Sequence, residues 1–570
     1  MKIFIPGQGS IQLSDSDFIY KGGEAKVYGK GDLAYKIYWK KDEVISLSKI
    51  KELQVLDRDN IIKPLSIILD HKNIPIGFSM LLIEDNFPFP VIFSNAFRRE
   101  NNIAPEKILE LVENIMGSTD FIHSKDCLVI DGNETNYLLS RDLKLVYFID
   151  VNNYQTKSFP GVYCDPSIRD WNTKGFNKLT DWYSFAIIAC KIFVGVHPFR
   201  GNHPDFPKTD IVARMKANVS IFNKKSTISN KARDFSNIPS EYFNWFIKLF
   251  EDGKRLPPPK VAGLLNVSPI KTKIVRDSKC FDISLFRKFQ DDIMKVRYEN
   301  GELITKTKKS MYIGKIPYPL SDISKELIIS PRSLTPVLVG IVNQLISITL
   351  LRPADLKKLN SCIHLMASDF FVSKNSIFLK HQGKLVEISI DELAGVIIPC
   401  VKSSWNIMSM SSYMFDSIVV QDVLGDIYLT IPIVNIGKRS SYTQIRIPEL
   451  DSYRIVAAKY DNYVCMLTGN RGSVYSKILI LFDKDFTDYQ CIIKNSGDYS
   501  NINFTSLDCG ICASINDDGS MEIFENKPGT NFKKIEDPDI KPSMTLCKYG
   551  SKVLFYETDT LFSISSKKGI

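Results

Sequence analysis

The sequence is poor in the residues that mark several classes of protein. Its 570 residues include only 30 Gly and 27 Pro, which excludes collagen-like and low-complexity chains. Eleven cysteines, an odd number scattered along a long chain, fit a reducing compartment better than a disulfide framework. The longest apolar stretch, residues 337–351, contains four polar residues and is too short to span a membrane, and the N-terminus has no signal-peptide pattern. These absences predict a cytoplasmic protein without a membrane partner.

The charge also lacks a strong bias. The net charge of +9 is shared by both halves, because residues 1–270 carry 35 basic and 31 acidic side chains and the remainder carries 38 and 33. A thinly spread excess gives no basic groove of the kind that binds nucleic acid. We therefore expect no nucleic-acid partner.

The chain is too long for one ordinary domain, and the spacing of its apolar residues changes near residue 275. Before that point, short β-like runs lead into segments of helical period such as residues 105–123. After it, short alternating runs are separated by Gly, Asn and Asp. Strand-turn-strand units recur there at roughly 40 to 50 residues, the repeat length of a propeller blade. The pattern favours a β-propeller of about seven blades, with a two-sheet β-domain as the alternative.

The first chemical motif is Gly22-Gly23-Glu24-Ala25-Lys26-Val27, between two β-like runs. Glycines at a hairpin tip let backbone N–H groups approach phosphates. A lysine in the next strand, Lys36, can reach under that tip to neutralise phosphate oxygens. Two adjacent glycines alone indicate only a hairpin.

Three further polar residues follow at defined spacings. Asp131 is followed five residues later by Asn136, and Asp150 comes fourteen residues after Asn136, at the end of an apolar strand. This order and spacing places a catalytic carboxylate beside two metal-binding side chains.

With these motifs in order, residues 18 to about 262 resemble a protein kinase domain. The match extends to Asp181-Trp182-Tyr183-Ser184 at the start of an apolar helix and to Arg255 near the domain's end. Phe148-Ile149-Asp150-Val151-Asn152 and Gly195-Val196-His197-Pro198-Phe199 are similar to a bacterial branch of Ser/Thr kinases. The resemblance implies a multidomain chain: a bilobal α+β kinase fold over 1–265 (lobes 1–84 and 85–265), a linker over 266–280 and the propeller over 281–570.

The resemblance also implies roles for individual residues. Lys36 would bind the phosphates of ATP, and Asp131 would orient the substrate hydroxyl. Asn136 and Asp150 would hold Mg²⁺ ions. The set of nucleotide-binding residues would comprise Gly22, Gly23, Val27, Lys36 and Glu52. Members of this branch are encoded beside a metal-dependent Ser/Thr phosphatase and a von Willebrand A-type protein, which are therefore implied as partners.

Several positions depart from the kinase pattern. Tyr20 and Ala25 replace two glycines of the lid, and Ile130 replaces the arginine before the catalytic aspartate. Lys49 occupies the place of the glutamate that pairs with the strand lysine, so Glu52, one turn further on, is expected to take that role. The Pro-Glu anchor of the activation segment is not recognisable between Cys164 and Asn172.

The leading interpretation is an ATP-dependent Ser/Thr protein kinase whose propeller binds a protein substrate or partner. A pseudokinase scaffold, which binds nucleotide without transfer, is the alternative that Tyr20, Ala25, Lys49 and Ile130 favour. A small-molecule kinase of the aminoglycoside type ranks last because of the extended segment from Asp181 to Arg255.

Overall fold

The computed structural model describes most of the chain. The described residues are 1–207, 210–228, 232–259, 280–320, 322, 324–351, 363–393, 396–434 and 440–567. The predicted linker, 266–280, lies outside them apart from Cys280, so the predicted domain boundaries stay predictions.

The N-terminal part is built on one antiparallel sheet of seven strands. Its order is β2 (Gly9–Gln12), β1 (Lys2–Ile5), β6 (Ser66–Leu69), β7 (Pro75–Leu81), β5 (Leu33–Tyr38), β4 (Ala25–Lys30) and β3 (Phe18–Lys21). One short helix, α1 (Leu47–Leu53), packs on this sheet after Ser46 caps its N-terminus by accepting from the N–H of Lys49. The tip between β3 and β4 carries the glycine pair.

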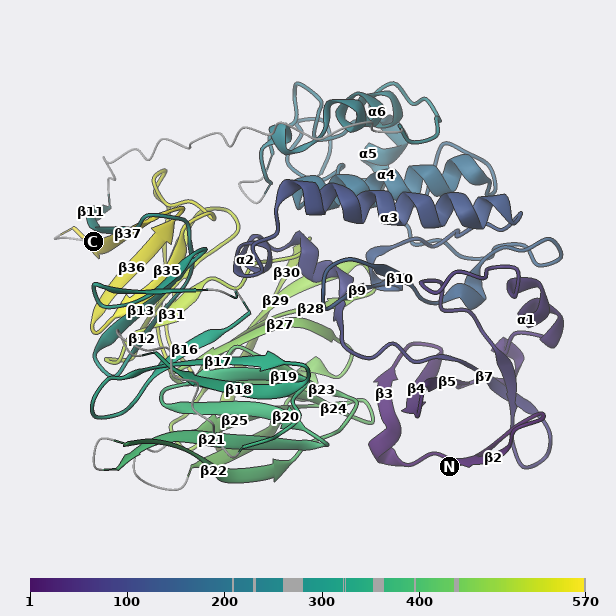
Figure 1. The fold of residues 1–570 in the computed structure, drawn as a ribbon. Helices are drawn as coiled ribbons and strands as arrows, with labels where there is room; N and C mark the ends of the chain where they lie inside the picture. The colour runs from purple at the N-terminus through teal and green to yellow at the C-terminus, as the bar shows by residue number, and fades with distance from the viewer. Residues whose placement is uncertain are drawn as a thin grey trace.

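A helical lobe follows. It contains α2 (Asn95–Glu100), α3 (Pro105–Ser124), α4 (Lys178–Val194), α5 (Ile211–Ala217), α6 (Ser240–Phe250) and a small sheet of β8 (Asn86–Pro88), β9 (Tyr137–Ser140) and β10 (Val146–Phe148). Helix α4 is buried on all sides from Thr180 to Val194, which is the pattern of a helix at the centre of a core. Asn177 caps its start and Gly195, at φ 87°, ends it. Helices α3 and α6 pack against α4 (Figure 1).

The rest of the described chain is all-β. Seven antiparallel sheets follow one another along it, six with four strands and one with three. The strands, grouped by sheet, are β12 (Ile293–Glu299), β13 (Glu302–Thr307), β14 (Ser310–Ile313) and β15 (Ile316–Pro319); β16 (Glu326–Ile329), β17 (Pro336–Val342) and β18 (Leu345–Leu350); β19 (Asp369–Ser373), β20 (Ser376–His381), β21 (Lys384–Leu393) and β22 (Val396–Asn406); β23 (Ser412–Phe415), β24 (Ile418–Val423), β25 (Asp426–Ile433) and β26 (Ser441–Arg446); β27 (Arg454–Asp461), β28 (Val464–Arg471), β29 (Val474–Phe482) and β30 (Tyr489–Gly497); β31 (Phe504–Ser506), β32 (Ile511–Ile515), β33 (Met521–Glu525) and β34 (Lys533–Ile535); and β35 (Thr545–Tyr549), β36 (Lys552–Glu557) and β37 (Thr560–Ser566) with β11 (Phe281–Lys288).

These sheets close into a ring. Each shares a buried apolar cluster with the next: Ile304 with Leu327, Val337 with Ile377, Phe378 with Val419, Leu429 with Leu467, Met466 with Phe504, Ile515 with Phe555, and Leu554 with Leu303. The last cluster joins the final sheet to the first one. Strand β11, from the start of the region, pairs with β37 from its end, and this pairing closes the ring. We call strands β11–β37 the β-ring.

The multidomain organisation and the all-β character of the C-terminal region, both predicted from the sequence, are confirmed. The two-sheet alternative is wrong, because the strands divide among seven sheets. None of the helices in the described part of the chain is both long and apolar enough to cross a membrane.

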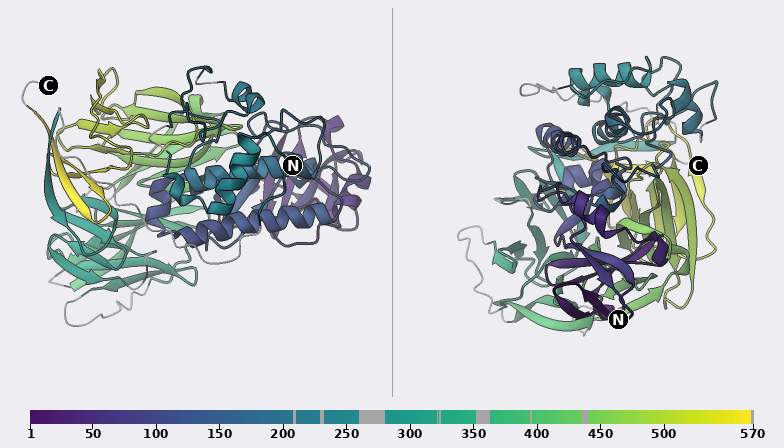
Figure 2. Two further views of the ribbon diagram at one scale, coloured as in Figure 1. Left: turned by 90° about the horizontal axis from the view of Figure 1, so that it is seen from above. Right: turned by 90° about the vertical axis from the view of Figure 1, so that its right-hand side faces the viewer.

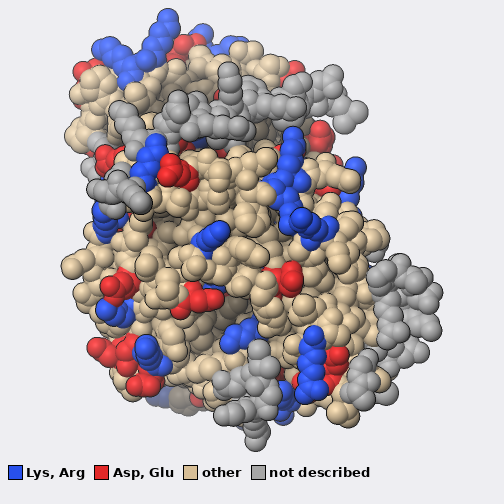
Figure 3. Space-filling model, turned by 90° about the vertical axis from the view of Figure 1, so that its left-hand side faces the viewer, with Lys and Arg blue, Asp and Glu red and all other residues tan. Residues whose placement is uncertain are grey.

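The β-ring packs against both of the other parts. It lies beside the N-terminal sheet and the helical lobe in two perpendicular views (Figures 1 and 2). Met408 and Leu424 of the ring pack on the core of the N-terminal sheet, while Val456, Tyr475 and Tyr499 belong to the core of the helical lobe. On the ring's outward side, acidic and basic side chains are mixed over a largely uncharged surface (Figure 3).

Closure of the ring generates a stability prediction. Phe555 is fully buried in the closing sheet, and its ring lies 5.1 Å from that of Phe562. We expect Phe555→Ala to lower the free energy of unfolding by about 3–5 kcal/mol, because it leaves a cavity at the closure. Leu285→Ala, on β11 of the same sheet and 59% exposed, is the control. Equal losses in urea unfolding of the two variants would contradict the importance of the closing core.

Candidate active site

Lys36 is a buried lysine at the centre of a cluster of charges whose acidic members, Glu24 and Asp150, reach the surface. It lies on β5 with 5% of its surface exposed. Its Nζ donates to Glu24 Oε1 at 2.6 Å and to Asp150 Oδ1 at 2.7 Å, and Asn152 Oδ1 lies 3.5 Å away. Burial disfavours the lysine charge, but Asp150, Tyr38 and Glu24 outweigh it, so the pKa of Lys36 is raised. Lys36 therefore stays protonated and is positioned by residues from three segments.

The expected pairing of Glu52 with Lys36 is wrong. Glu52 accepts instead from the backbone N–H of Ser158 at 3.1 Å, and hydrogen bonds from Thr156 and Ser158 lower its pKa. Lys49 is half-buried on α1, and this burial lowers its pKa. Glu24, at the lid, supplies the glutamate that α1 does not. Residues 24 and 36 meet because β4 pairs with β5, with Val27 opposite Lys36.

Asp131 is held at both carboxylate oxygens. Oδ1 accepts from the N–H of Asp165 at 2.8 Å, and Oδ2 accepts from the side-chain amides of Asn133 at 2.9 Å and Asn136 at 3.1 Å. Burial raises the pKa of Asp131 in spite of these bonds. The carboxyl group is thus fixed in orientation and made more basic than an exposed aspartate, as a group that orients a hydroxyl proton requires.

The segment before Asp131 is tied to α4 by Asp181. Its carboxylate accepts from the backbone N–H groups of Val129 at 2.7 Å and Ile130 at 3.0 Å, and it contacts His123 Nε2 at 2.9 Å. Ile130 has φ 65°, a strained conformation for a β-branched residue, which these bonds hold in place. The sequence placed Asp181 at a helix start without assigning this role, although an aspartate inside an apolar run was a signal for it.

Asp150 and Asn136 lie close together. The N–H of Ile149 donates to the carbonyl of Asn136 at 3.0 Å, which joins the end of β10 to the Asp131 loop. Asp150 has φ 61°, so the chain turns sharply there into the short helix η5 (Val151–Asn153). The structure therefore brings Lys36, Asp131, Asn136 and Asp150, all predicted from the sequence, into one site.

The lid is a tight hairpin tip. Gly22 N–H donates to Ala25 O at 2.8 Å, and Trp39 Nε1 donates to Gly22 O at 3.2 Å. Neither Gly22 nor Gly23 has a positive φ, and a Cβ on Gly23 would meet open space. Since the fold itself does not require glycine at residue 23, the small residue leaves room for a group that approaches the backbone.

An ion pair that holds the segment after Asp150, between Asp170 and Arg255, was not predicted from the sequence. Asp170, buried, accepts from Arg255 Nε at 2.6 Å and from Arg255 Nη2 at 2.7 Å. Burial opposes the charge of Asp170, but bonds from Arg255 and Thr173 outweigh it and lower the pKa of Asp170. Asp170 thus ties the segment after Asp150 to Arg255, near the end of the helical lobe.

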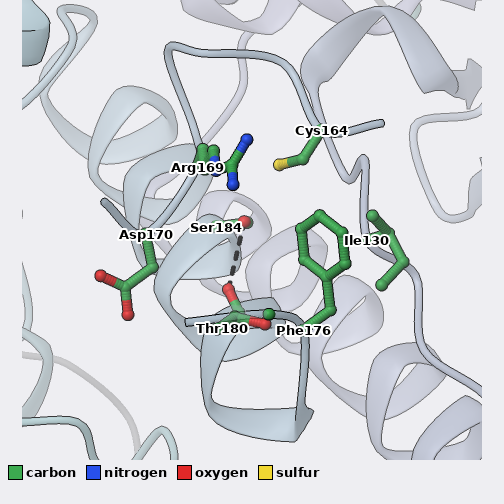
Figure 4. Close-up of a pocket in the computed structure, with 8 residues that line it drawn as sticks. Ile130, Cys164, Arg169, Asp170, Phe176, Thr180 and Ser184 are labelled. Carbon is green, nitrogen blue, oxygen red and sulfur yellow. Dashed lines mark hydrogen bonds between the residues drawn. The ribbon is translucent and has the colours of Figure 1, made fainter. Parts of the chain in front are cut away.

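A shallow hollow lies beside this ion pair (Figure 4). Its walls combine apolar and polar side chains and comprise Ile130, Cys164, Arg169, Asp170, Gly175, Phe176, Thr180 and Ser184. Ile130 and Cys164 adjoin Asp131 and Asp165, whose hydrogen bond fixes the Asp131 carboxylate. Next to it, Val162 and Tyr163 are 91% and 64% exposed. Two exposed apolar side chains thus directly precede Cys164, a residue of the hollow, along the chain.

Comparisons with known proteins give little beyond this geometry. No family model matches the chain, and no curated protein matches it. One solved structure, the kinase PK-1 of the Cydia pomonella granulovirus, is 13% identical and aligns over 42% of this chain and 86% of its own, with a TM-score of 0.32.

The Asp170–Arg255 pair generates a second stability prediction. We expect Arg255→Met to lower the free energy of unfolding by about 3–5 kcal/mol, because it leaves the buried Asp170 carboxylate without its cationic partner. Stability from a lowered carboxyl pKa is present above the ordinary value of 3.8 and is lost as the pH falls below it. The difference from wild type should therefore shrink in acid.

Lys254→Met, at a neighbouring exposed lysine, is the control for this measurement. Urea unfolding between pH 3 and pH 7 provides the test. A pH-independent difference would show that Asp170 does not depend on Arg255 for its charge.

Proposed function

We propose that the protein is an ATP-dependent Ser/Thr protein kinase. The single observation that carries the proposal is the 2.7 Å contact of Lys36 Nζ with Asp150 Oδ1, beside a loop in which Asp131 and Asn136 are already oriented. A charged lysine, a basic carboxylate and two oxygen ligands are the groups that phosphoryl transfer requires, since its catalysis is mainly positioning and charge neutralisation.

The residues fit Mg²⁺ and the phosphates of ATP. Asn136 turns its amide nitrogen toward Asp131, to the carbonyl at 2.8 Å, which leaves the amide oxygen directed away as a possible ligand. The second oxygen of Asp150 has only a long contact of 3.4 Å with Asn153. Mg²⁺ is commonly held by one or two protein oxygens together with phosphate oxygens and water, and when bound it would neutralise charge on the phosphates.

Metal binding by this site would depend on ATP. Among the described residues, no group of three or more His, Cys, Asp and Glu side chains comes together to hold an ion. A carboxylate and an amide form an incomplete site that phosphate oxygens complete. We therefore expect Mg²⁺ to bind with ATP and not ahead of it.

The lid and Lys36 would receive the phosphates. Gly22 and Gly23 form the tip above the lysine, and Val27 faces Lys36 across the strand pair. Glu24 keeps the lysine charged and oriented. The transfer would form a phosphoester between the γ-phosphorus of ATP and a protein hydroxyl whose proton Asp131 accepts. The bond from the γ-phosphorus to the β,γ-bridging oxygen would break, and ADP would leave with that oxygen.

For the β-ring we propose a seven-bladed β-propeller that binds a protein substrate or partner. Closed succession of the sheets and pairing of β11 with β37 support this architecture. The metal-dependent phosphatase and the von Willebrand A-type protein implied by the sequence remain predicted partners. Pull-down of each purified protein by the full chain tests them.

A second candidate function, the pseudokinase scaffold, has one observation in its favour. The Glu24 carboxylate lies 2.6 Å from Lys36 Nζ, in the position that a phosphate oxygen would take. In that case Glu24 would compete with the nucleotide instead of supporting it.

Phosphotransfer provides the main test. We expect the full chain with MgATP to autophosphorylate, and Lys36→Ala and Asp150→Ala to reduce the rate by at least about 100-fold, because each removes a charge that stabilises the transferring group. Lys41→Ala and Asp142→Ala, at exposed positions, should retain the wild-type rate. Absence of transfer from the wild-type chain, with ATP binding intact, would favour the pseudokinase.

Nucleotide affinity separates the two roles of Glu24. If Glu24 orients Lys36 for phosphate, Glu24→Gln should raise the Kd for ATP several-fold. If Glu24 instead competes with the phosphate for Lys36, the same substitution should lower the Kd. Glu52→Gln, the matched change at the residue that the structure places elsewhere, should leave the Kd unchanged. Calorimetric titration with MgATP measures all three values, and a change only in the Glu52 variant would contradict the assignment.

A further inference from the structure

The loop from Asp131 to Asn136 contains a residue that the proposed chemistry does not use. Glu134 is fully buried between them along the chain. Its Oε1 is paired with Lys191 of α4, itself buried, while Oε2 has no hydrogen-bond partner among the described residues. A buried carboxylate with one free oxygen is sensitive to every donor that remains.

One of those donors belongs to the β-ring. The hydroxyl of Tyr475, on β29, lies 3.4 Å from Glu134 Oε1, and its aromatic ring lies 6.0 Å from Lys191 Nζ. Tyr475 is fully buried. A residue more than 300 positions away thus completes the surroundings of Glu134.

A second residue of the β-ring contacts Thr135, the next residue of the loop. Arg454, at the start of β27, donates from Nη1 to the carbonyl of Thr135 at 3.2 Å. Strands β27 and β29 belong to the same sheet, which lies next to β9 and the helical lobe (Figure 1). One sheet of the ring therefore holds two successive residues of the loop.

This contact is part of a continuous packed interface. Val456, Tyr475 and Tyr499 share the core of the helical lobe. Around them, Ser94 donates to Asn501 at 3.0 Å, and Arg200 lies 3.7 Å from Asp498. Because close-packed cores transmit displacements, the ring fixes where Glu134 and Thr135 lie.

We propose that the β-ring sets the geometry of the Asp131–Asn136 loop, with Arg454 and Tyr475 as positioning residues for Asp131 and Asn136. The catalytic consequence rests on the proposed kinase function. The two outer residues of the loop are joined by Glu134 and Thr135, so movement of these two shifts both Asp131 and Asn136. The kinase-like part and the ring are in this sense a single catalytic unit.

The test compares two double variants of the full chain. Arg454→Met/Tyr475→Phe removes both contacts to the loop. Arg471→Met/Tyr489→Phe is the matched control. Arg471 donates to the carbonyl of Glu449 and lies over the Tyr453 side chain, and the Tyr489 hydroxyl donates to Glu449 Oε2 at 2.9 Å, so these contacts stay within the β-ring. The measurements are ADP formation from MgATP, the KM for ATP, and hydrogen exchange of the backbone amides of residues 131–137.

We expect the first variant to lower kcat by about tenfold to a hundredfold with little change in KM for ATP, because small displacements of positioned groups reduce rate more than binding. Amide exchange in residues 131–137 should rise several-fold in this variant and not in the control. Unchanged exchange relative to the control, or unchanged kcat in an active enzyme, would overturn the proposal. If the wild-type chain forms no ADP, the kinase function fails, and a rise in exchange would still show that the ring holds the loop.

Discussion

The geometry of the candidate site depends on one buried carboxylate. Asp181 accepts from two backbone N–H groups, of Val129 and Ile130, in a part of the helical lobe that water does not reach. Leaving both donors unsatisfied would cost several kcal/mol, so the chain before Asp131 takes the strained path that Ile130 shows. The position of Asp131 follows from that path, and Asp165 and Asn136 are placed around it.

Charge balance organises the other side of the site. Lys36 is too deeply buried to be charged without partners, and Asp150 and Glu24 provide them. Asp150 comes from the end of β10 and Glu24 from the lid, so one lysine links the sheet, the lid and the helical lobe. Asn152 adds a polar contact to Lys36 and donates to the hydroxyl of Tyr38 at 3.2 Å. Its amide therefore joins two residues of β5 to the segment after Asp150.

Buried contacts join the β-ring to the helical lobe. A fused domain on a linker would act by bringing partners close. Here the ring shares buried residues with the lobe, and Tyr475 lies inside that core. The proposed function therefore gives the β-ring a part besides recognition, which is to hold the Asp131–Asn136 loop.

Patterns in the sequence are enough to single out residues whose spacing is local: Asp131 with Asn136, Asp150 at the end of an apolar run, and Lys36 after the glycine pair. They also indicate the change to an all-β region. These follow from short-range periodicity and from distances that a few residues span. The packed fold was needed to show that Glu24 and not Glu52 pairs with Lys36, that Asp170 pairs with Arg255, and that Tyr475 touches Glu134. Each pair contains one buried charged residue, which is Lys36, Asp170 or Glu134. A buried charge takes whichever partner the packed fold brings within reach, and sequence distance carries no information about that choice.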